Sequence, residues 1–305
     1  MIKLKKLSLS NFCGYKDFNI DLLDKDNQVK KWTILFGPNG TGKSNFLEAV
    51  RILTNPSLLR GRRDTLLFFR KMTYSPNYLP GYEGFDTSLT KMRIEALFDT
   101  PEGNKRVIMQ NELTVEEVNG KEKVVQTKDS GLILDEMKNT SPNSIYIDAD
   151  NPMNMQKFQL NSKYKEEFLD FAKEVYGLEC QIPDDHLQMK TTREYAGEEG
   201  YIDFCTDFII VKKNGTKVHF RSMSAGERKI ATMLRSLFNQ VYKNDRYGII
   251  LIDNVEMHIY YKRHMKLMYK LGEYFGDRQL IVTTHSPVII DSMDKNYLVD
   301  LEDYI

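Results

Sequence analysis

The chain has 305 residues, 41% of them apolar, which is enough to bury the core of one large α/β domain or two small domains. Its 43 Lys and Arg residues balance 43 Asp and Glu residues. This balance excludes a nucleic-acid coating protein and confines any nucleic-acid contact to a local patch. Neither a disordered nor a collagen-like composition fits.

The cysteines and the apolar runs indicate in which cellular compartment the protein is expected. Cys13, Cys180 and Cys205 lie far apart and form no CxxC pair, which disfavours a disulfide framework and a zinc site. No apolar run approaches the ~18 residues of a membrane span, and the N-terminus has no apolar core of a secretion signal. We therefore expect a soluble, cytoplasmic protein with no membrane contact.

The first quarter of the chain predicts a hairpin, a buried strand and a helix. Apolar and polar residues alternate over 2–9 and again over 18–22, with a turn at Gly14 between them, which is typical of two paired strands. The apolar stretch 32–36 predicts a short strand that ends at a glycine-rich turn. A helix follows with apolar residues at helical spacing, and Pro56 ends it.

The rest of the chain predicts further strands and helices between loops. Residues 57–75 mix arginines with leucines and phenylalanines, and residues 76–89 have the composition of a loop. We expect strands at 92–98, 107–115, 145–147, 209–211, 217–220, 249–252 and 280–282. We expect helices at 162–177, 226–242 and 259–275. Pro101–Asn104 and Asn214-Gly215 predict the turns of two hairpins.

The turn after the strand at 32–36 matches the phosphate-binding pattern GxxxxGK[ST], set between a strand and a helix. It reads Gly37-Pro38-Asn39-Gly40-Thr41-Gly42-Lys43-Ser44, and we add Asn45 as a binding residue. The glycines let backbone N–H groups turn toward phosphate oxygens, and the following helix points its positive end at the same anion. Lys43 supplies a cation for the β- and γ-phosphates, and Ser44 supplies a hydroxyl to Mg²⁺.

A second motif, Ser222–Lys229, opens the helix expected at 226–242. It resembles the signature of ABC ATPases, usually written LSGGQ. Ser224 would cap the helix with Glu227 at the capping-box position, and the small residues Ala225 and Gly226 leave room for a phosphate. An ordinary capped helix explains this segment equally well.

Two apolar strands deliver polar residues at their ends. Residues 249–252 lead to Asp253, the Walker B arrangement, in which the carboxylate holds Mg²⁺, commonly through water. A buried strand that ends in a capping Asp is the plainer explanation. Residues 280–284 lead to His285, which resembles the switch histidine of ABC ATPases that reaches the γ-phosphate, although a lone His is more often structural.

Together with the opening stretch Ile2–Leu22, these motifs resemble the RecF/SMC/OLD-like branch of ABC ATPases. The resemblance covers residues 1–55 and 205–290 well and the middle poorly. It implies ATP and Mg²⁺ as cofactors, and a homodimer formed through the ATP sites. Each ATP would lie between the P-loop of one copy and Ser224 and Gly226 of the other. ATP would join the copies, and hydrolysis would release them.

The expected fold is an α/β P-loop NTPase with a mixed sheet, in which antiparallel N-terminal hairpins lie beside a parallel core. Residues 1–150 would form the half of the ATPase head that holds the P-loop and the antiparallel strands. Residues 206–305 would form the half that holds the signature, Walker B and the switch histidine. Residues 151–205 are expected to form a small helical insert between the two halves.

The residue after Asp253 departs from the family. A glutamate normally stands there and deprotonates the attacking water, whereas this chain has Asn254. An amide cannot accept a proton at neutral pH, although it can position water. Glu256 and His258 follow at the spacing of the related DEPExHLHP pattern, and either can substitute as base. Our candidate catalytic residues are Asn254, Glu256 and His285. Three interpretations follow: hydrolysis is slow, it uses another base, or it is absent and ATP acts as a structural clamp. A fourth is that Asn254 was introduced by engineering to trap ATP.

Two further departures concern the contacts around the nucleotide. Related heads place a Gln just after a strand like that at 145–147, but this chain reads Asp148-Ala149-Asp150, and the nearest Gln is Gln156. We assign no residue to this role. Cys13 stands where an Arg or Lys is common, and we expect a small inert side chain there.

The resemblance also bears on partners. Residues 58–64 resemble an arginine-bearing loop of SMC-type heads that would meet DNA phosphate or nucleotide, but a solvated basic face is favoured by the neutral charge of the chain. No heptad array is present, and about 20 residues follow His285, too few for the Toprim nuclease domain of OLD-like proteins. A bare head needs an effector, such as a nuclease or toxin, and such short heads imply anti-phage defence.

Two rival functions stay open beside a slow, dimerising ATPase. An ATP-clamped scaffold or sensor without turnover is motivated by Asn254. A small-molecule P-loop kinase leaves the signature and His285 unexplained, and no lid or acceptor pocket can be located for it.

Overall fold

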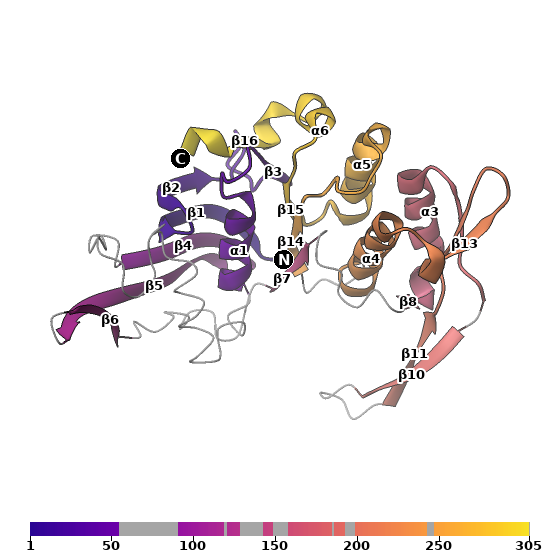
Figure 1. Ribbon diagram of the computed structural model, residues 1–305, viewed down its shortest axis with the longest axis horizontal. Coiled ribbons are helices and arrows are strands. Elements are labelled where there is room, and N and C mark those ends of the chain that lie inside the picture. The colour runs from indigo at the N-terminus through magenta and orange to yellow at the C-terminus, as the bar shows by residue number, and fades with distance from the viewer. Residues whose placement is uncertain are drawn as a thin grey trace.

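The computed structural model describes residues 1–54, 91–118, 121–128, 143–148, 158–184, 186–192, 199–242 and 247–304. The arginine-bearing stretch expected at 58–64, Asp150 and Gln156 lie outside these ranges. Within them the chain forms an α/β fold, with a parallel sheet between an antiparallel sheet and a lobe of helices (Figure 1). No helix among these residues is both long and apolar enough to cross a bilayer.

The central sheet has five parallel strands in the order β16-β3-β15-β14-β7. They are β3 (Trp32–Phe36), β7 (Asn143–Asp148), β14 (Tyr247–Asp253), β15 (Gln279–Thr283) and β16 (Leu298–Asp300). Ile250 and Ile252 enter the core on the side of the helical lobe, whereas Ile249 and Leu251 enter the core on the other side. Because both faces are covered, β14 reads as a continuous apolar run, and the prediction of a buried parallel strand is confirmed.

The antiparallel sheet has the order β2-β1-β4-β5-β6. Its strands are β1 (Lys3–Phe12), β2 (Tyr15–Asp21), β4 (Lys91–Thr100), β5 (Gly103–Val118) and β6 (Lys121–Lys128). The hairpins expected about Gly14 and about residues 101–104 are confirmed as β1–β2 and β4–β5. Helix α1 (Lys43–Thr54) packs in the same core, so this sheet supports the P-loop helix.

Three helices cover the other face of the parallel sheet. They are α3 (Lys165–Tyr176), α4 (Ala225–Gln240) and α5 (His264–Phe275), and a short α6 (Pro287–Ser292) follows β15. Aromatic side chains join them, with Phe238 of α4 in ring contact with Phe171 of α3 and Phe275 of α5. The hairpin expected about Asn214-Gly215 is confirmed as β12 (Ile209–Val211) and β13 (Lys217–His219).

Two expectations need correction. The 151–205 segment is not purely helical, because its described part holds α3 and four strands, β8 (Leu160–Asn161), β9 (Glu179–Gln181), β10 (His186–Thr192) and β11 (Glu199–Cys205). The helix expected from 259 begins only at His264, since residues 254–260 form turns with positive φ at Asn254 (51°) and His258 (65°). Strand β8 pairs with β11, and β9 pairs with β12. Both pairings join residues distant in sequence, which local periodicity does not encode.

Candidate functional site

The P-loop connects the carboxyl end of β3 to the first residue of α1, Lys43. Its three glycines all have positive φ angles, 137° at Gly37, 88° at Gly40 and 83° at Gly42. Gly42 is the most constrained, because a Cβ there would lie 2.8 Å from the Cζ atom of Tyr15. The Tyr15 hydroxyl donates a hydrogen bond to the Gly42 carbonyl at 3.0 Å. The β1–β2 hairpin therefore packs against the P-loop at Gly42 through Tyr15.

Lys43 is held against the loop that it follows. Its Nζ donates to the carbonyls of Gly37 (2.9 Å) and Pro38 (2.8 Å). Burial lowers the pKa of Lys43, while the nearby negative charges of Asp253 and Glu256 act in the opposite direction. The ammonium is thus placed where the loop and the Walker B carboxylate meet.

The end of β14 is tied to the end of β15 through one threonine. The Thr283 hydroxyl donates to Oδ1 of Asp253 at 2.5 Å and accepts from the backbone N–H of Asn254 at 2.7 Å. The other Asp253 oxygen accepts from the Tyr146 hydroxyl on β7 at 3.3 Å. Arg51 of α1 lies over the Tyr146 ring, 5.0 Å from its centroid. Three neighbouring strands therefore fix the position of the buried Asp253 carboxylate.

Glu256 joins the same two loops further along. Its Oε2 accepts from the Thr284 hydroxyl and its Oε1 accepts from the backbone N–H of His285, both at 2.7 Å. The His285 side chain is exposed. Glu256 thus contacts the backbone of the candidate switch histidine directly.

A cavity of about 320 Å³ lies at this edge of the parallel sheet. Its lining comprises Asn39, Gly40, Gly42, Lys43, Ser44, Asn45, Asn254 and His285. One cavity is therefore lined by the P-loop, by Asn254 after Walker B and by the candidate switch histidine His285. These residues lie up to about 250 positions apart in the sequence. Within the part of the chain that the structure describes, no carboxylate lines it.

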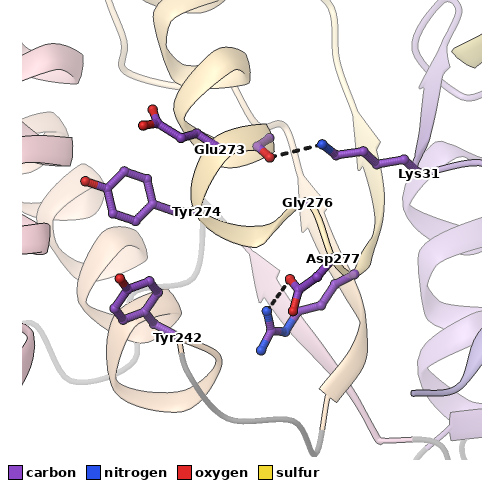
Figure 2. A pocket seen from close by; sticks show the side chains of 8 residues that line it. Lys31, Tyr242, Glu273, Tyr274, Gly276 and Asp277 are labelled. Atoms are coloured by element: carbon purple, nitrogen blue, oxygen red, sulfur yellow. Dashed lines mark hydrogen bonds and ion pairs between the residues drawn. The ribbon is translucent and has the colours of Figure 1, made fainter.

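A larger cavity, of about 650 Å³, lies at the opposite edge, where β3 and β15 begin (Figure 2). Its charges balance, with Lys31 and Arg278 against Glu273 and Asp277. Arg278 pairs with Asp277 at 2.5 Å, and Lys31 donates to the Gly272 carbonyl at 3.1 Å (Figure 2). Ligands of open α/β sheets bind outside the carboxyl ends of the strands, so the smaller cavity is the candidate site.

The signature segment forms a separate, exposed feature. Ser224 caps α4 in a complete capping box, because its Oγ accepts from the Glu227 N–H at 3.3 Å and its own N–H donates to the Glu227 carboxylate at 2.9 Å. Burial by itself would raise the pKa of Glu227, but hydrogen bonds from Lys212 and Ser224 lower it. A Cβ on Gly226 would lie 3.2 Å from the Cβ of His258. Neither Ser224 nor Gly226 lines the P-loop cavity.

Comparison with known proteins agrees with this geometry. The RecF/RecN/SMC N-terminal domain family matches residues 3–304. The chain belongs to this family.

Relatives of this SMC-type head cover almost its whole length. Septu protein PtuA of Bacillus thuringiensis is 22% identical over 329 residues, which cover 99% of this chain and 76% of PtuA. Endonuclease GajA of Bacillus cereus (strain VD045) is 21% identical over 348 residues, which cover 98% of this chain and 58% of GajA. An Smc head bound to the C-winged helix domain of ScpA has a similar fold, with a TM-score of 0.53 at 15% identity, over 97% of this chain and 93% of that one.

The donors at the cavity suit a hard cation in this SMC-type head. Ser44 lines the cavity and offers an exposed hydroxyl, and Asp253, which does not line the cavity, offers a buried carboxylate at the end of β14. No group of three or more His, Cys, Asp or Glu side chains that would hold a metal by itself occurs among the described residues. One hydroxyl and one carboxylate, completed by water and phosphate oxygens, is the donor set that Mg²⁺ prefers.

Sequence reasoning missed the residues that hold the site together. Tyr15, Tyr146, Thr283 and Thr284 belong to no phosphate-binding motif, yet they fix the P-loop, Asp253 and Glu256. Their sequence signal is only that they lie in or next to predicted strands, which many structural residues share. For Cys13, burial raises the pKa of the thiol to about 12, which agrees with the expected inert side chain.

Proposed function

We propose that this SMC-type head binds ATP with Mg²⁺, dimerises around the nucleotide and regulates a partner effector, with slow hydrolysis. Two copies would meet head to tail, so that Ser224 and Gly226 of one copy close the P-loop cavity of the other. Lys43 would contact the β- and γ-phosphates, Ser44 and Asp253 would hold Mg²⁺, and His285 would face the γ-phosphate.

The observation that carries this proposal is the shared lining of one cavity by the P-loop, Asn254 and His285. Ser224 supports the dimer, because it caps a 16-residue helix, is exposed, and lies outside that cavity. A helix start with Ala225 and Gly226 beside the cap lets an anion from another molecule approach its N–H groups.

Light scattering with and without Mg·ATP tests the dimer. We expect the mass of 35.6 kDa to double with Mg·ATP, and Lys43→Ala to stay a monomer that releases no phosphate. Ser224→Arg should bind ATP with unchanged affinity but stay a monomer, since its bulk lies outside the chain's own cavity. Wild-type protein that binds ATP without gaining mass would contradict the proposed dimer.

An ATP-clamped scaffold without turnover is the second candidate function, favoured by Asn254 at a cavity whose described lining holds no carboxylate. Asn254→Glu should then create phosphate release and shorten the lifetime of the ATP-bound dimer. Asn254→Gln is the matched control, because glutamine has the length of glutamate but no carboxylate. It should leave phosphate release and the lifetime of the dimer unchanged. No gain with Glu would mean that position 254 does not contact the attacking water.

The effector is proposed to be a nuclease or toxin that acts in anti-phage defence. Similarity to Septu protein PtuA and to endonuclease GajA supports this setting, and the Smc head of similar fold that is bound to ScpA supports a separate protein as partner. Plaque counts on a host that carries the native locus should rise when Lys43→Ala replaces the wild-type chain. Unchanged counts over a broad phage panel would argue against the defence role. A solvated basic face is the favoured explanation of residues 58–64, and a DNA contact there would instead give salt-dependent DNA binding that is lost with Arg62→Ala and Arg63→Ala together.

A further inference from the structure

Both oxygens of the Glu256 carboxylate accept hydrogen bonds from within the protein. Oε1 accepts from the His285 N–H and Oε2 accepts from the Thr284 hydroxyl, each at 2.7 Å. The Thr284 oxygen also accepts from the Ser286 N–H at 3.0 Å, so the bonds form a continuous chain. Glu256 is not among the residues that line the P-loop cavity. Its oxygens therefore contact the loop after β15.

The backbone around His285 is fixed on both sides by the loop that follows β14. On one side, the Val255 N–H donates to the Thr283 carbonyl at 3.0 Å. On the other side, the Ser286 hydroxyl bonds His264 Nδ1 at 2.7 Å, and His264 Nε2 bonds the Ile259 carbonyl at 2.9 Å. Glu256 supplies the bond in the middle, at His285 itself. The imidazole is left exposed at the cavity while its backbone is held.

A general base needs a lone pair directed at the attacking water. Each oxygen of the Glu256 carboxylate has a protein donor at 2.7 Å, and the residues that line the cavity from the loops after β14 and β15 are Asn254 and His285, not Glu256. Charge-assisted hydrogen bonds of this kind are among the stronger ones in proteins, so the carboxylate is costly to detach.

We propose that Glu256 is a positioning residue and not the general base of this head: it fixes the backbone of His285 so that the imidazole faces the P-loop cavity. This inference rests on the proposed ATP function, because it assigns a role within the same site. It also explains why a carboxylate is present at 256 although the usual catalytic position holds Asn254.

Steady-state phosphate release separates positioning from base catalysis. Glu256→Gln keeps both bonds, because the amide oxygen accepts from the His285 N–H and the amide N–H donates to a rotated Thr284 hydroxyl. Its turnover should stay within about 3-fold of wild type, whereas loss of a general base lowers the rate about 100-fold or more. Glu256→Ala frees the loop and should lower turnover about 10- to 100-fold, the scale of a misplaced group. Glu166→Gln, on the exposed first turn of α3, is the matched surface control and should match wild type.

A spectroscopic readout keeps the test valid if turnover is too slow to measure. The chain has five histidines, and His285→Ala assigns the His285 imidazole signal in a histidine-labelled sample. Mg·ATP should shift that signal in wild type and in Glu256→Gln. In Glu256→Ala the signal should already be displaced without nucleotide, and its response to Mg·ATP should be lost. A double Glu256→Ala, His285→Ala variant should turn over no more slowly than His285→Ala alone.

Thr284→Val provides a second perturbation if Glu256→Ala fails to fold. It removes one of the two donors to Glu256 and should weaken the His285 response, while Thr284→Ser keeps the hydroxyl and should behave as wild type. Loss of turnover in Glu256→Gln by about 100-fold, or an unchanged His285 signal in Glu256→Ala and Thr284→Val, would overturn the positioning role. Wild type that fails to bind Mg·ATP would instead overturn the proposed function itself.

Discussion

The P-loop cavity and the signature turn carry the two halves of the proposed ATP site, and they are built in different ways. The cavity depends on bonds between distant segments, such as Thr283 to Asp253 and Glu256 to His285. The signature turn contains a local capping box between residues three positions apart, Ser224 and Glu227, and Lys212 and Tyr176 also contact Glu227. One region is a product of the assembled sheet, and the other is a local capping motif on an exposed helix start.

On the proposed function, this difference would let one head form its half of the nucleotide site without the second copy. The cavity is preorganised by three parallel strands whose carboxyl ends meet at one edge. The signature turn needs no other part of the cavity to keep its shape, and it is exposed. An exposed turn that lies outside the cavity of its own chain suits contact with a second molecule.

Gly42→Ala should give the largest effect, on the cavity side of the comparison. Alanine at position 42 would have to adopt a left-handed backbone conformation, and its Cβ would lie 2.8 Å from the Tyr15 ring. We therefore expect a loss of about 3 kcal/mol in the free energy of unfolding. Gly40→Ala is the matched control, because its φ is similar (88°) but nothing lies within 4 Å of the new Cβ. Urea unfolding should show a loss of about 1 kcal/mol there. Equal losses for both variants would mean that Tyr15 does not restrict the loop.

Thr283→Val should follow, because it removes the hydroxyl that joins Asp253 to the Asn254 N–H. The buried Asp253 carboxylate and the partly buried Asn254 N–H each lose a partner, so we expect about 2 kcal/mol of destabilisation and weaker Mg·ATP binding. Thr33→Val on β3 is the control: its buried hydroxyl has no hydrogen-bond partner among the described residues, so valine should be neutral or stabilising. Thermal unfolding and nucleotide titration of both variants check this. Similar losses in the two would remove the special role of Thr283.

Ser224→Ala tests the signature side. Loss of the cap should cost about 1 kcal/mol, and the chain's own nucleotide affinity should not change, because Ser224 lies outside the cavity. The ATP-dependent gain in mass should weaken if Ser224 contacts a second copy. Asp294→Ala, which removes the cap of the short helix at Lys295–Tyr297, should lose stability without altering association. A weaker nucleotide affinity of monomeric Ser224→Ala would break the separation of the two regions.

Glu227→Gln should give the smallest effect, and it depends on pH. Glutamine still completes a capping box, but the charge that Lys212 pairs with is lost. The folded-state pKa of Glu227 lies below its usual value of 4.5, so its ionised form stabilises the fold above that value, and the benefit disappears as pH falls through the lower folded pKa. Wild type should exceed Glu227→Gln by about 0.5 kcal/mol at pH 7, with the gap closing toward pH 3. Lys212→Met should reduce the gap at pH 7; a gap that persists in acid would contradict the assignment.

The sequence by itself determined the local elements of this protein. The phosphate loop, the hairpins about Gly14 and Asn214-Gly215, and the buried run at 249–252 follow from spacing and turn chemistry within a few residues. Periodicity of 2 or 3.6 is a property of neighbouring residues, and the signature cap is likewise local. These features needed no knowledge of how the chain folds back on itself.

Only the tertiary structure decided which residues share the cavity and what Glu256 contacts. Asn254 and His285 reach the P-loop because β3, β15 and β14 are neighbours in one parallel sheet, an order that is not written in any single segment. Sequence spacing made Glu256 a candidate base, whereas its partners, Thr284 and the His285 N–H, lie 28 and 29 residues away. Strands β8 and β9 of the 151–205 segment were missed for the same reason, since they pair with residues distant in sequence, which short-range patterns do not specify.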